Sequence, residues 1–448
     1  MNDTLFPLPP AEEPKPNLGK GKPRLKKAER RQIKMEPTKL DDLLAEDHPA
    51  RLVWSLVQGL DLSPFYETIQ AVEGQAGQNA IDPAILVTLW LYATLEGIGS
   101  ARLLDRLCQE HIAYRWICGG VSVNYHTLAD FRVKHGALLE DVLIKTVASM
   151  RAEELVTLQR VTQDGKRVRA SAGSSSFHRR KTLEEHLREA KQQVAVLRKE
   201  LEDDPGTTTR RQKAARERAA RERVERVEKA NQRLEKLDAA HAKRNKKEDQ
   251  KQRAREPRAS TTDDEATIMK MADGGFRPAY NIQFSTDTKS KVIVGVDVSL
   301  QGNDSGLMGP MQQQIVEDHG YSPQEYLADG GFVNLKDFEE AEKQGTHVYA
   351  PVPTPRRKNQ DPYAPRPSDS LEIASWRQRM ATEAAKTIYK ERASVAEWVN
   401  AVQHNRGLVA LRVRGREKVK AIVLWFALLH NLLRGLVLRQ AAASALAN

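Results

Sequence analysis

The stretch YNIQFSTDTKSKVIVGVDVSLQ, residues 280–301, contains two runs in which apolar and polar side chains alternate. Alternation with a period of two is typical of β-strands, and the polar DTKS between the runs is typical of a turn. The sequence therefore predicts an antiparallel strand pair. Upstream, LVTLQRVTQDGKRVRASAG at residues 155–173 alternates in the same way and predicts a further strand, which carries Asp164.

Downstream of residue 301, helical and strand patterns alternate. Asp304 and Ser305 stand where an N-terminal cap would begin a helix. The next predicted elements are the strand EYLAD, a helix over residues 334–344, the strand HVYAPVP and one long helix over about 371–405. Strands followed by alternating helices and strands predict a mixed sheet flanked by helices, which is an α/β layer fold.

The region before the sheet has a different character. Residues 1–40 are rich in proline, lysine and glutamate and predict a disordered basic tail, whereas residues 41–155 show helical periodicity and predict an all-helical domain. One pair of helices, the second bearing His126 and Arg132, has two interpretations. It is either a helix-turn-helix that binds DNA or part of a generic helical bundle.

A charged segment interrupts the sheet between its first part, residues 156–177, and its remainder, residues 259–448. In the segment, residues 178–258, apolar side chains recur at spacings of three and four on both sides of DDPGTTT. This pattern predicts an inserted antiparallel coiled-coil hairpin. The segment holds 26 Lys and Arg against 16 Asp and Glu, which is most of the formal net charge of +11. These charges form either a solvated face or a DNA contact. The parts in which acidic and basic residues are interleaved favour the solvated face, and AKRNKKEDQKQRAR favours the DNA contact.

The bulk composition limits the class of protein. The chain has 448 residues, and its excess of basic over acidic side chains indicates a polyanionic partner. Two cysteines and an N-terminus without an apolar core favour a reduced, cytoplasmic location. A zinc site at Cys108, His111, Cys118 and His126 matches no regular ligand spacing. The apolar stretch 421–438 predicts a buried helix rather than a membrane span, because polar residues interrupt it.

Three acids occupy positions where such a sheet places function. Asp164 lies on the first predicted strand, Asp329 ends the strand EYLAD, and Glu397 lies on the helix that follows the last strand. Converging carboxylates stay ionised when a cation lies among them, and hard oxygen ligands suit Mg²⁺ or Mn²⁺. Two such ions activate a water or a 3′-hydroxyl for attack on phosphorus. A basic protein with an acidic site therefore predicts a nucleic-acid phosphodiester as substrate.

Each acid also has an ordinary interpretation. The dipeptide of Asp164 and Gly165 is a good two-residue hairpin turn, and Asp329 before two glycines is a good loop cap. Glu397 is one of many helix carboxylates. Asp297 in VIVGVDVSL competes for the role of Asp164, but its strand is expected to lie farther from that of Asp329. The joint placement of the three acids favours the metal-site hypothesis.

The chain contains, in order, the motifs SVNYHTLADFRVKH, VTQDGKRVRASAG, FRPAYNIQFSTDT, YLADGGF and YKERASVAEWVNAVQHNRGL, followed by RVRGREKV. Together they resemble the DDE-class transposases of bacterial insertion sequences, in the branch named for insertion sequence 1182. The resemblance covers residues from about 41 to 438. It implies a ribonuclease-H-like catalytic core in which Asp164, Asp329 and Glu397 form the catalytic, metal-binding triad.

The third motif of that family places a tyrosine and an arginine before the glutamate and a lysine seven residues after it. Tyr389, Arg392 and Glu397 match, whereas the lysine position holds His404. Residues seven apart lie about 20° apart on a helix, so His404 is expected to reach DNA as a shorter, mostly neutral substitute. The candidate DNA contacts are Tyr389, Lys390, Arg392, His404, Arg412, Arg414, His126 and Arg132.

The resemblance implies a DNA transposase that binds the terminal inverted repeats of its own element. It would cut the element ends with two Mg²⁺ or Mn²⁺ ions and join the 3′-hydroxyls to double-stranded target DNA. A homodimer is expected because two ends must be held together, and no membrane contact is expected. Two alternatives stay open: a non-catalytic or decayed DNA-binding protein, and a metal-dependent nuclease that cuts without joining.

Overall fold

The computed structural model describes residues 38–72, 79–203, 207–245, 256–355 and 360–447. The chain divides into two units, Met1–Leu43 and Leu44–Asn448. The described part of the first unit contains one 3-10 turn, Asp41–Leu43. The predicted tail over residues 1–40 lies almost wholly outside the described residues.

The second unit begins with helices, as the periodicity predicts. They are α1 Pro49–Gln58, α2 Ser63–Glu67, α3 Pro83–Leu95, α4 Ala101–Glu110, α5 Ile112–Cys118, α6 Tyr125–Lys134 and α7 Gly136–Ala152. The α3 helix begins where the sequence indicates, because the Asp82 side chain accepts a hydrogen bond from Ala84 N and Pro83 stands in the first turn. Residues 83–94 are all buried, so α3 is the central helix of this bundle.

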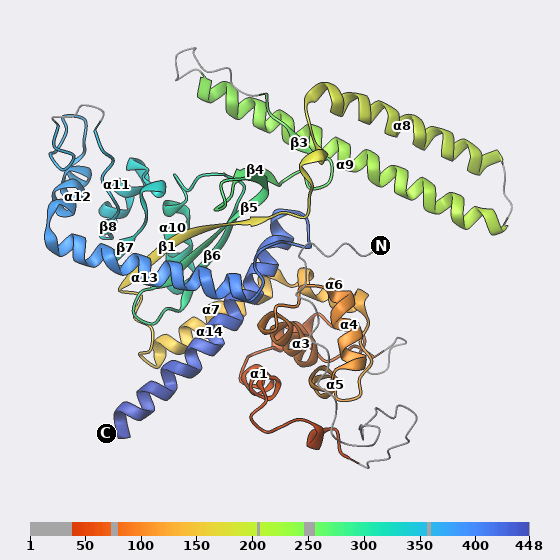
Figure 1. Cartoon of the computed structure of the whole chain (residues 1–448), viewed down its shortest axis with the longest axis horizontal. Helices are drawn as coiled ribbons and strands as arrows, with labels where there is room; N and C mark the ends of the chain where they lie inside the picture. Colours follow the sequence, from red (N-terminus) through yellow and green to blue (C-terminus); the bar gives the residue numbers. More distant parts are fainter. Residues whose placement is uncertain (1–37, 73–78, 204–206, 246–255, 356–359, 448) are drawn as a thin grey trace, which may run out of the picture. The chain divides into compact units, whose positions relative to one another are not determined.

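A mixed six-stranded sheet follows (Figure 1). The strands of the chain are β1 Arg160–Arg169, β2 Phe177–His178, β3 Ala259–Ser260, β4 Thr267–Lys270, β5 Phe276–Asp287, β6 Ile293–Ser299, β7 Glu325–Leu327 and β8 His347–Tyr349. In the sheet β1 is central: it pairs antiparallel with β5 and parallel with β7, and β7 pairs parallel with β8. Both β4 and β6 pair antiparallel with β5. The predicted mixed α/β architecture is confirmed.

The turn interpretation of Asp164 and Gly165 is wrong. Both residues lie inside β1, where Asp164 pairs with Phe284 and Gly165 with Gln283. Gly165 allows a close approach from one face of the strand. A Cβ atom there would stand 2.5 Å from Asp304 Oδ1 and 2.5 Å from Gln283 Nε2. The glycine is therefore required by packing rather than by a turn.

The helices that accompany the sheet are α10 Met308–His319, α11 Leu335–Lys343, α12 Leu371–Ala381, α13 Glu383–Asn405 and α14 Arg416–Ala447. Two predictions need correction. The long helix expected over 371–405 is broken at Thr382, whose backbone is extended and whose side chain accepts from Ala385 N to begin α13. Asp304 does not cap α10, because its Oδ1 instead accepts hydrogen bonds from Asn281 and Gln283.

The C-terminal helix α14 is the described helix that is long and apolar enough to span a membrane, and 72% of its apolar window is buried. Its polar residues bind the turn between β5 and β6. His430 Nε2 lies 2.8 Å from Lys291 O, and the Asn431 amide pairs with the N and O of Ile293. Arg434 donates to Ser290 O. Asn431 thus satisfies the backbone of the edge strand β6, which explains the polar interruptions in an apolar helix.

The inserted segment forms two helices, α8 Arg180–Asp203 and α9 Thr207–Asn245. They run antiparallel, as the pairs Arg180–Asp238 and Lys191–Glu228 show. A small apolar cluster around Leu183, Val227 and Leu234 joins them, and β2 pairs with β3 at the base of the hairpin. The helical hairpin is present, whereas coiled-coil geometry stays a prediction.

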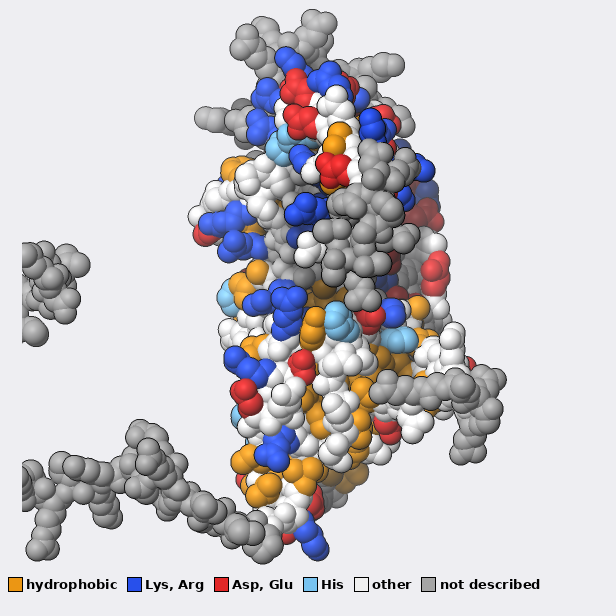
Figure 2. Space-filling view, turned by 90° about the vertical axis from the view of Figure 1, so that its right-hand side faces the viewer, with side chains coloured by type: hydrophobic (Ala, Val, Ile, Leu, Met, Phe, Trp, Pro, Cys, Tyr) orange, Lys and Arg blue, Asp and Glu red, His pale blue; other side chains and the backbone are white. Residues whose placement is uncertain are grey.

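Several charges on the described part of the hairpin are paired with opposite charges. Lys and Arg side chains lie among Asp and Glu side chains on the face shown in Figure 2. Pairs such as Lys229–Glu225 and Arg221–Glu217 lie within single helical turns of α9. This arrangement favours the solvated-face interpretation for these residues. The side chains of AKRNKKEDQKQRAR, residues 242–255, lie outside the described residues.

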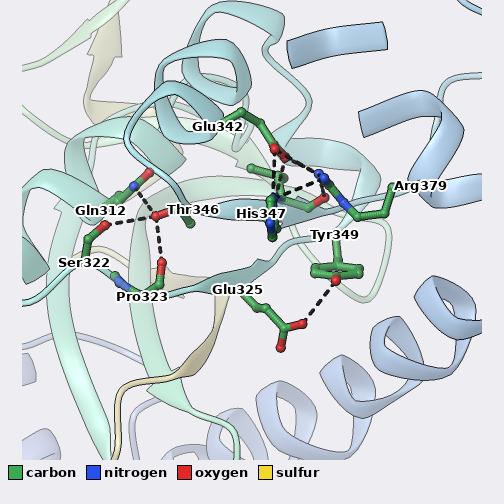
Figure 3. Close-up of polar contacts among 10 residues, drawn as sticks. Gln312, Ser322, Pro323, Glu325, Glu342, Thr346, His347, Tyr349 and Arg379 are labelled. Atoms are coloured by element: carbon green, nitrogen blue, oxygen red, sulfur yellow. Dashed lines mark hydrogen bonds and ion pairs between the residues drawn. The ribbon is translucent and has the colours of Figure 1, made fainter. Parts of the chain in front are cut away.

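A polar cluster fixes the edge strand β8 (Figure 3). Glu342 of α11 forms a buried ion pair with Arg379 of α12, and Arg379 also donates to Val348 O. Beside it, Thr346 Oγ1 donates to Pro323 O and accepts from Gln312. These contacts tie α10, α11 and α12 to β8 and to the chain just before β7. The contact at Pro323 lies at the start of β7, whereas Asp329 follows its end.

Candidate active site

The parallel pairing of β1 and β7 brings Asp164 and Asp329 to the same edge of the sheet. Thr162 of β1 pairs with Leu327 of β7, and each aspartate lies two residues further along its own strand direction. Asp329 follows the end of β7, and its Oδ1 accepts a hydrogen bond of 2.7 Å from Gly331 N. Their negative charges interact, because Asp329 raises the pKa of Asp164.

Asp164 lies in a polar but poorly hydrated environment. Burial raises the pKa of Asp164 to about 6, while the positive charge of Arg392 opposes that rise. Asn400 Nδ2 donates to Asp164 Oδ2 at 2.8 Å, and Arg392 Nη1 lies 3.8 Å from Oδ1. Arg392 Nη1 and Asn400 Oδ1 are themselves buried without a hydrogen-bond partner among the described residues. The site thus holds donor and acceptor groups that the folded chain leaves unused.

The helix α13 supplies these groups, and an ionic network fixes its position. Arg160 at the start of β1 contacts both Glu325 of β7 and Glu391 of α13. Tyr349 of β8 donates to the other oxygen of Glu325. Lys166 Nζ, on the same face of β1 as Asp164, donates to Asn400 O at 2.9 Å. These contacts hold α13 along β1 directly, and Glu325 extends the network to β7 and β8.

Glu397, the third predicted acid, is exposed on α13. It lies three residues before Asn400, so its Cβ is about 60° away around the helix from a residue that contacts Asp164. Among the described residues, no three His, Cys, Asp or Glu side chains converge closely enough to hold a metal ion. The structure thus brings Asp164 and Asp329 together, whereas Glu397 lies on α13, about 60° around the helix from Asn400.

The donor set of this edge fits a divalent cation in its chemistry. Asp164 and Asp329 offer carboxylate oxygens, the ligands that Mg²⁺ and Mn²⁺ prefer. Burial and the neighbouring negative charge raise the pKa of Asp164, and a bound cation would relieve both effects. Glu397 would be the third carboxylate.

Sequence reasoning missed three residues at this site. Asn400 and Lys166 contact Asp164 and α13 as described above, and burial lowers the pKa of Lys166 to about 8. Asp304 is the third. It approaches β1 from the face of Gly165, and its Oδ2 lies 3.7 Å from the position of a Cβ at Gly331. No local pattern in the sequence marks Asn400, Lys166 or Asp304 as site residues, because their contacts depend on long-range packing.

The predicted DNA contacts fall into different environments. Tyr389 is half-buried, and burial raises its pKa, with the charges of Asp329 and Asp164 adding to the rise. Several other candidates on α13 and after it are exposed, namely Lys390, His404, Arg412 and Arg414. His126 is exposed on α6. Arg132 is buried at 7% exposure, so it does not lie on an open face of α6.

The rival residue and the zinc hypothesis are resolved by position. Asp297 lies on β6, which pairs with β5 and not with β7, and it binds Arg416 at 2.9 Å. It is therefore separated from Asp329 by β5 and β1. Both cysteines are free and buried, and His111 uses its Nδ1 to cap α5.

Comparison with protein families finds transposase domain models that match two parts of the chain. Residues 38–134 match a family described as Transposase domain (DUF772), and residues 255–432 match the Transposase DDE domain. No curated protein matches the chain. A DDE transposase domain has a ribonuclease-H-like fold, in agreement with the mixed sheet. The two matches support the assignment of the chain to the DDE transposases.

The second match includes Asp329 and Glu397 but begins after the hairpin. Asp164 lies on β1, before the hairpin, and enters the same sheet by pairing with β5 and β7. Through this pairing, the strand that carries Asp164 joins the sheet formed by the matched region.

Proposed function

We propose that the chain is the transposase of an insertion sequence of the branch named for insertion sequence 1182. It would bind the terminal inverted repeats of its element, cleave the DNA ends and join them to target DNA. The observation that carries the proposal is the pair Asp164 and Asp329 on adjacent parallel strands, with α13 packed across them.

In this proposal Asp164, Asp329 and Glu397 hold one or two divalent ions, Mg²⁺ or Mn²⁺. Such an ion supplies a Lewis acid for the phosphoryl oxygens and lowers the pKa of water. Arg392 has a buried Nη1 without a hydrogen-bond partner, and it would donate to a phosphate oxygen of the scissile DNA. Asn400 and Lys166 orient Asp164 and α13 and so keep the acids in register.

The exposed candidates would bind the flanking DNA. Lys390 and His404 lie on α13, and Arg414 lies between α13 and α14, so their charges would contact phosphates beside the acids. His126 on α6 would contact DNA from the helical region. Two chains would act together on two element ends as a homodimer, with the charged hairpin as the means of pairing, in the cytoplasm on nucleoid DNA.

A strand-transfer assay separates the proposal from its alternatives. The full chain is incubated with Mg²⁺ and a labelled duplex taken from the DNA that flanks its gene, together with a supercoiled target plasmid. We expect cut ends and a longer, joined product. Cut ends without joined product would indicate a nuclease, and binding without cutting would indicate a DNA-binding protein that has lost catalysis.

A further inference from the structure

A small cavity lies where the loop after α3 meets the segment between α13 and α14, away from the three acids. It has a volume of about 30 Å³. Its charged lining residues are Arg132 of α6 and Arg406 and Arg412 of the segment between α13 and α14. The rest of the wall is formed by glycine backbone, Thr94 and apolar side chains such as Ile98 and Phe426. Arg132 belongs to the first matched transposase domain, and Arg406 and Arg412 belong to the second.

Two glycine turns close the wall of this cavity. Gly97 and Gly407 both have positive φ angles, 71° and 92°. A Cβ atom on Gly407 would stand 3.3 Å from Gly97 O and 3.5 Å from Gly97 Cα. The backbones of the two regions therefore touch directly, because neither turn carries a side chain there. The cavity is a built junction rather than a gap between loose loops.

Arg132 forms the buried end of the cavity. Its Nη1 donates to Gly99 O at 2.7 Å, and its guanidinium lies 4.3 Å from the ring centroid of Trp90. Its Nε is buried without a hydrogen-bond partner. Burial lowers the pKa of Arg132 to about 10, and the charge of Arg412 adds to the effect. The folded protein thus holds this cation in an unfavourable environment.

The other two arginines complete a cationic cluster. Arg406 is half-buried, and its Nη1 is also buried without a hydrogen-bond partner. Arg412 is exposed at the rim, and both Arg412 Nε and Arg132 Nη1 lie within 4.0 Å of the position of a Cβ at Gly99. In the described parts of the chain, no carboxylate lies within ion-pair distance of any of the three. Three clustered cations without a counter-ion indicate a site for an anion.

We propose that this cavity, named here the arginine pocket, binds one phosphate of the DNA backbone. Guanidinium groups match the geometry of phosphate oxygens. A cavity of about 30 Å³ holds two or three atoms of the size of water, which suits the free oxygens of one phosphate and excludes a base. The inference deepens the proposed function, because its ligand is the DNA on which the transposase would act.

The arginine pocket is connected to the catalytic strand. Arg169, the last residue of β1, accepts a hydrogen bond from Leu411 N at 2.8 Å and donates to Val409 O at 3.2 Å. These bonds join β1 to the segment that carries Arg412. The junction on β1, at Arg169, is five residues beyond Asp164 along the strand. A phosphate bound in the pocket would therefore fix the DNA relative to both the helical region and the strand of Asp164.

The test measures DNA binding in EDTA, so that catalysis plays no part. Fluorescence anisotropy is recorded for the full chain with a duplex from the DNA flanking its gene, in a series in which each phosphate in turn is replaced by a neutral methylphosphonate. We expect one position at which the replacement weakens wild-type binding about tenfold. Arg412→Ala should bind the unmodified duplex about tenfold more weakly and should lose no further affinity at that position. Lys418→Ala, which removes one exposed charge outside the pocket, is the control and should behave as wild type.

Several outcomes would overturn the proposal. If Arg412→Ala lost affinity at every replaced phosphate as wild type does, the pocket would hold no DNA phosphate. If inorganic phosphate raised the melting temperature of wild type but not of Arg412→Ala, while DNA affinity stayed equal, the ligand would be a free anion. Both outcomes are distinct from failure of the proposed function. A chain that never cuts DNA can still show one phosphate whose replacement weakens binding by wild type but not by Arg412→Ala.

Discussion

At the scale of single residues, Gly331 controls the position of Asp329. Its N–H holds Asp329 Oδ1, and a Cβ at Gly331 would stand 2.9 Å from that same oxygen. Gly330 differs, since a Cβ there would meet no heavy atom within 4 Å. Two adjacent glycines therefore have different roles, and the chain offers a matched pair of variants.

We expect Gly331→Ala to slow DNA end cleavage about 100-fold, because a carboxylate displaced by a fraction of an ångström loses the geometry of the reaction. Its melting temperature should change little, because its backbone φ is not in the left-handed region. Gly330→Ala should cleave as wild type does. Single-turnover cleavage of a labelled duplex checks both, and equal rates for the two variants would contradict the assigned role of Gly331.

His430 makes the stability of the fold depend on pH. Burial lowers its pKa from 6.5 to about 4, and the charges of Arg406 and Arg434 add to the effect. The unfolded chain takes up a proton below pH 6.5 that the folded chain accepts only near pH 4. Stability from this residue is therefore complete above pH 6.5 and is lost as the pH falls toward 4.

The comparison of wild type with His430→Gln isolates this effect. Between pH 7 and pH 4.5 the free energy of unfolding of wild type should fall by about 2–3 kcal/mol more than that of the variant. Urea unfolding followed by tryptophan fluorescence at the two pH values measures the difference. Parallel pH profiles would show that His430 carries no such linkage.

At the residue scale the sequence predicted the positions of Asp164 on a strand and Asp329 after a strand better than it predicted their surroundings. Asp164 and Asp329 were predictable because strand alternation and the glycine pair are local patterns. Asp304 was predicted to cap a helix. Its hydrogen bonds with Asn281 and Gln283 could not be predicted, because those residues lie on a strand distant in sequence. Asn400 carried no local signal, because its role depends on how α13 crosses β1. Arg132 was predicted as a DNA contact of the helical region, whereas the structure encloses it between Trp90 and Gly99.

At the scale of elements, the helical hairpin is joined to the rest of the chain through one short strand pair. Its strands β2 and β3 pair His178 with Ala259 and Phe177 with Ser260. The apolar cluster of the hairpin is separate from the clusters that cover the sheet. The chain thus leaves and re-enters the core at neighbouring points.

Replacing residues 179–258 by Asn-Gly should therefore leave the core folded. The dipeptide forms a two-residue turn that suits the antiparallel pair of His178 and Ala259. We expect one cooperative thermal transition within a few degrees of that of the full chain, measured by circular dichroism. Aggregation, or loss of the transition, would show that the hairpin stabilises the sheet. The control is the shortened chain mixed with α8 and α9 supplied as a separate polypeptide.

The elements were predicted well where their signals are local. Strands β5 and β6 and the two helices of the hairpin follow from periodicity and turn chemistry. The break between α12 and α13 was missed, because one threonine in an otherwise helical pattern gives a weak signal. The order of the strands required the structure, since β1 and β7 are separated by more than 150 residues in sequence.

At the scale of the whole molecule, the separate features support the proposed transposase. The helical region and the sheet share an apolar core through α14, so DNA bound by one is held relative to the other. Two transposase domain matches, a mixed sheet with two adjacent aspartates and a formal net charge of +11 agree with action on DNA. The central claim is that Asp164, Asp329 and Glu397 form one catalytic site.

The rate of Mg²⁺-dependent cleavage of a labelled element end tests that claim most directly. Asp164→Asn, Asp329→Asn and Glu397→Gln should each lose about 1,000-fold or more in rate while keeping DNA affinity in EDTA. Asp297→Asn, which removes the acid of the rival strand, should cleave within about twofold of wild type. Wild-type cleavage by Asp329→Asn, or an equal loss in Asp297→Asn, would contradict the account.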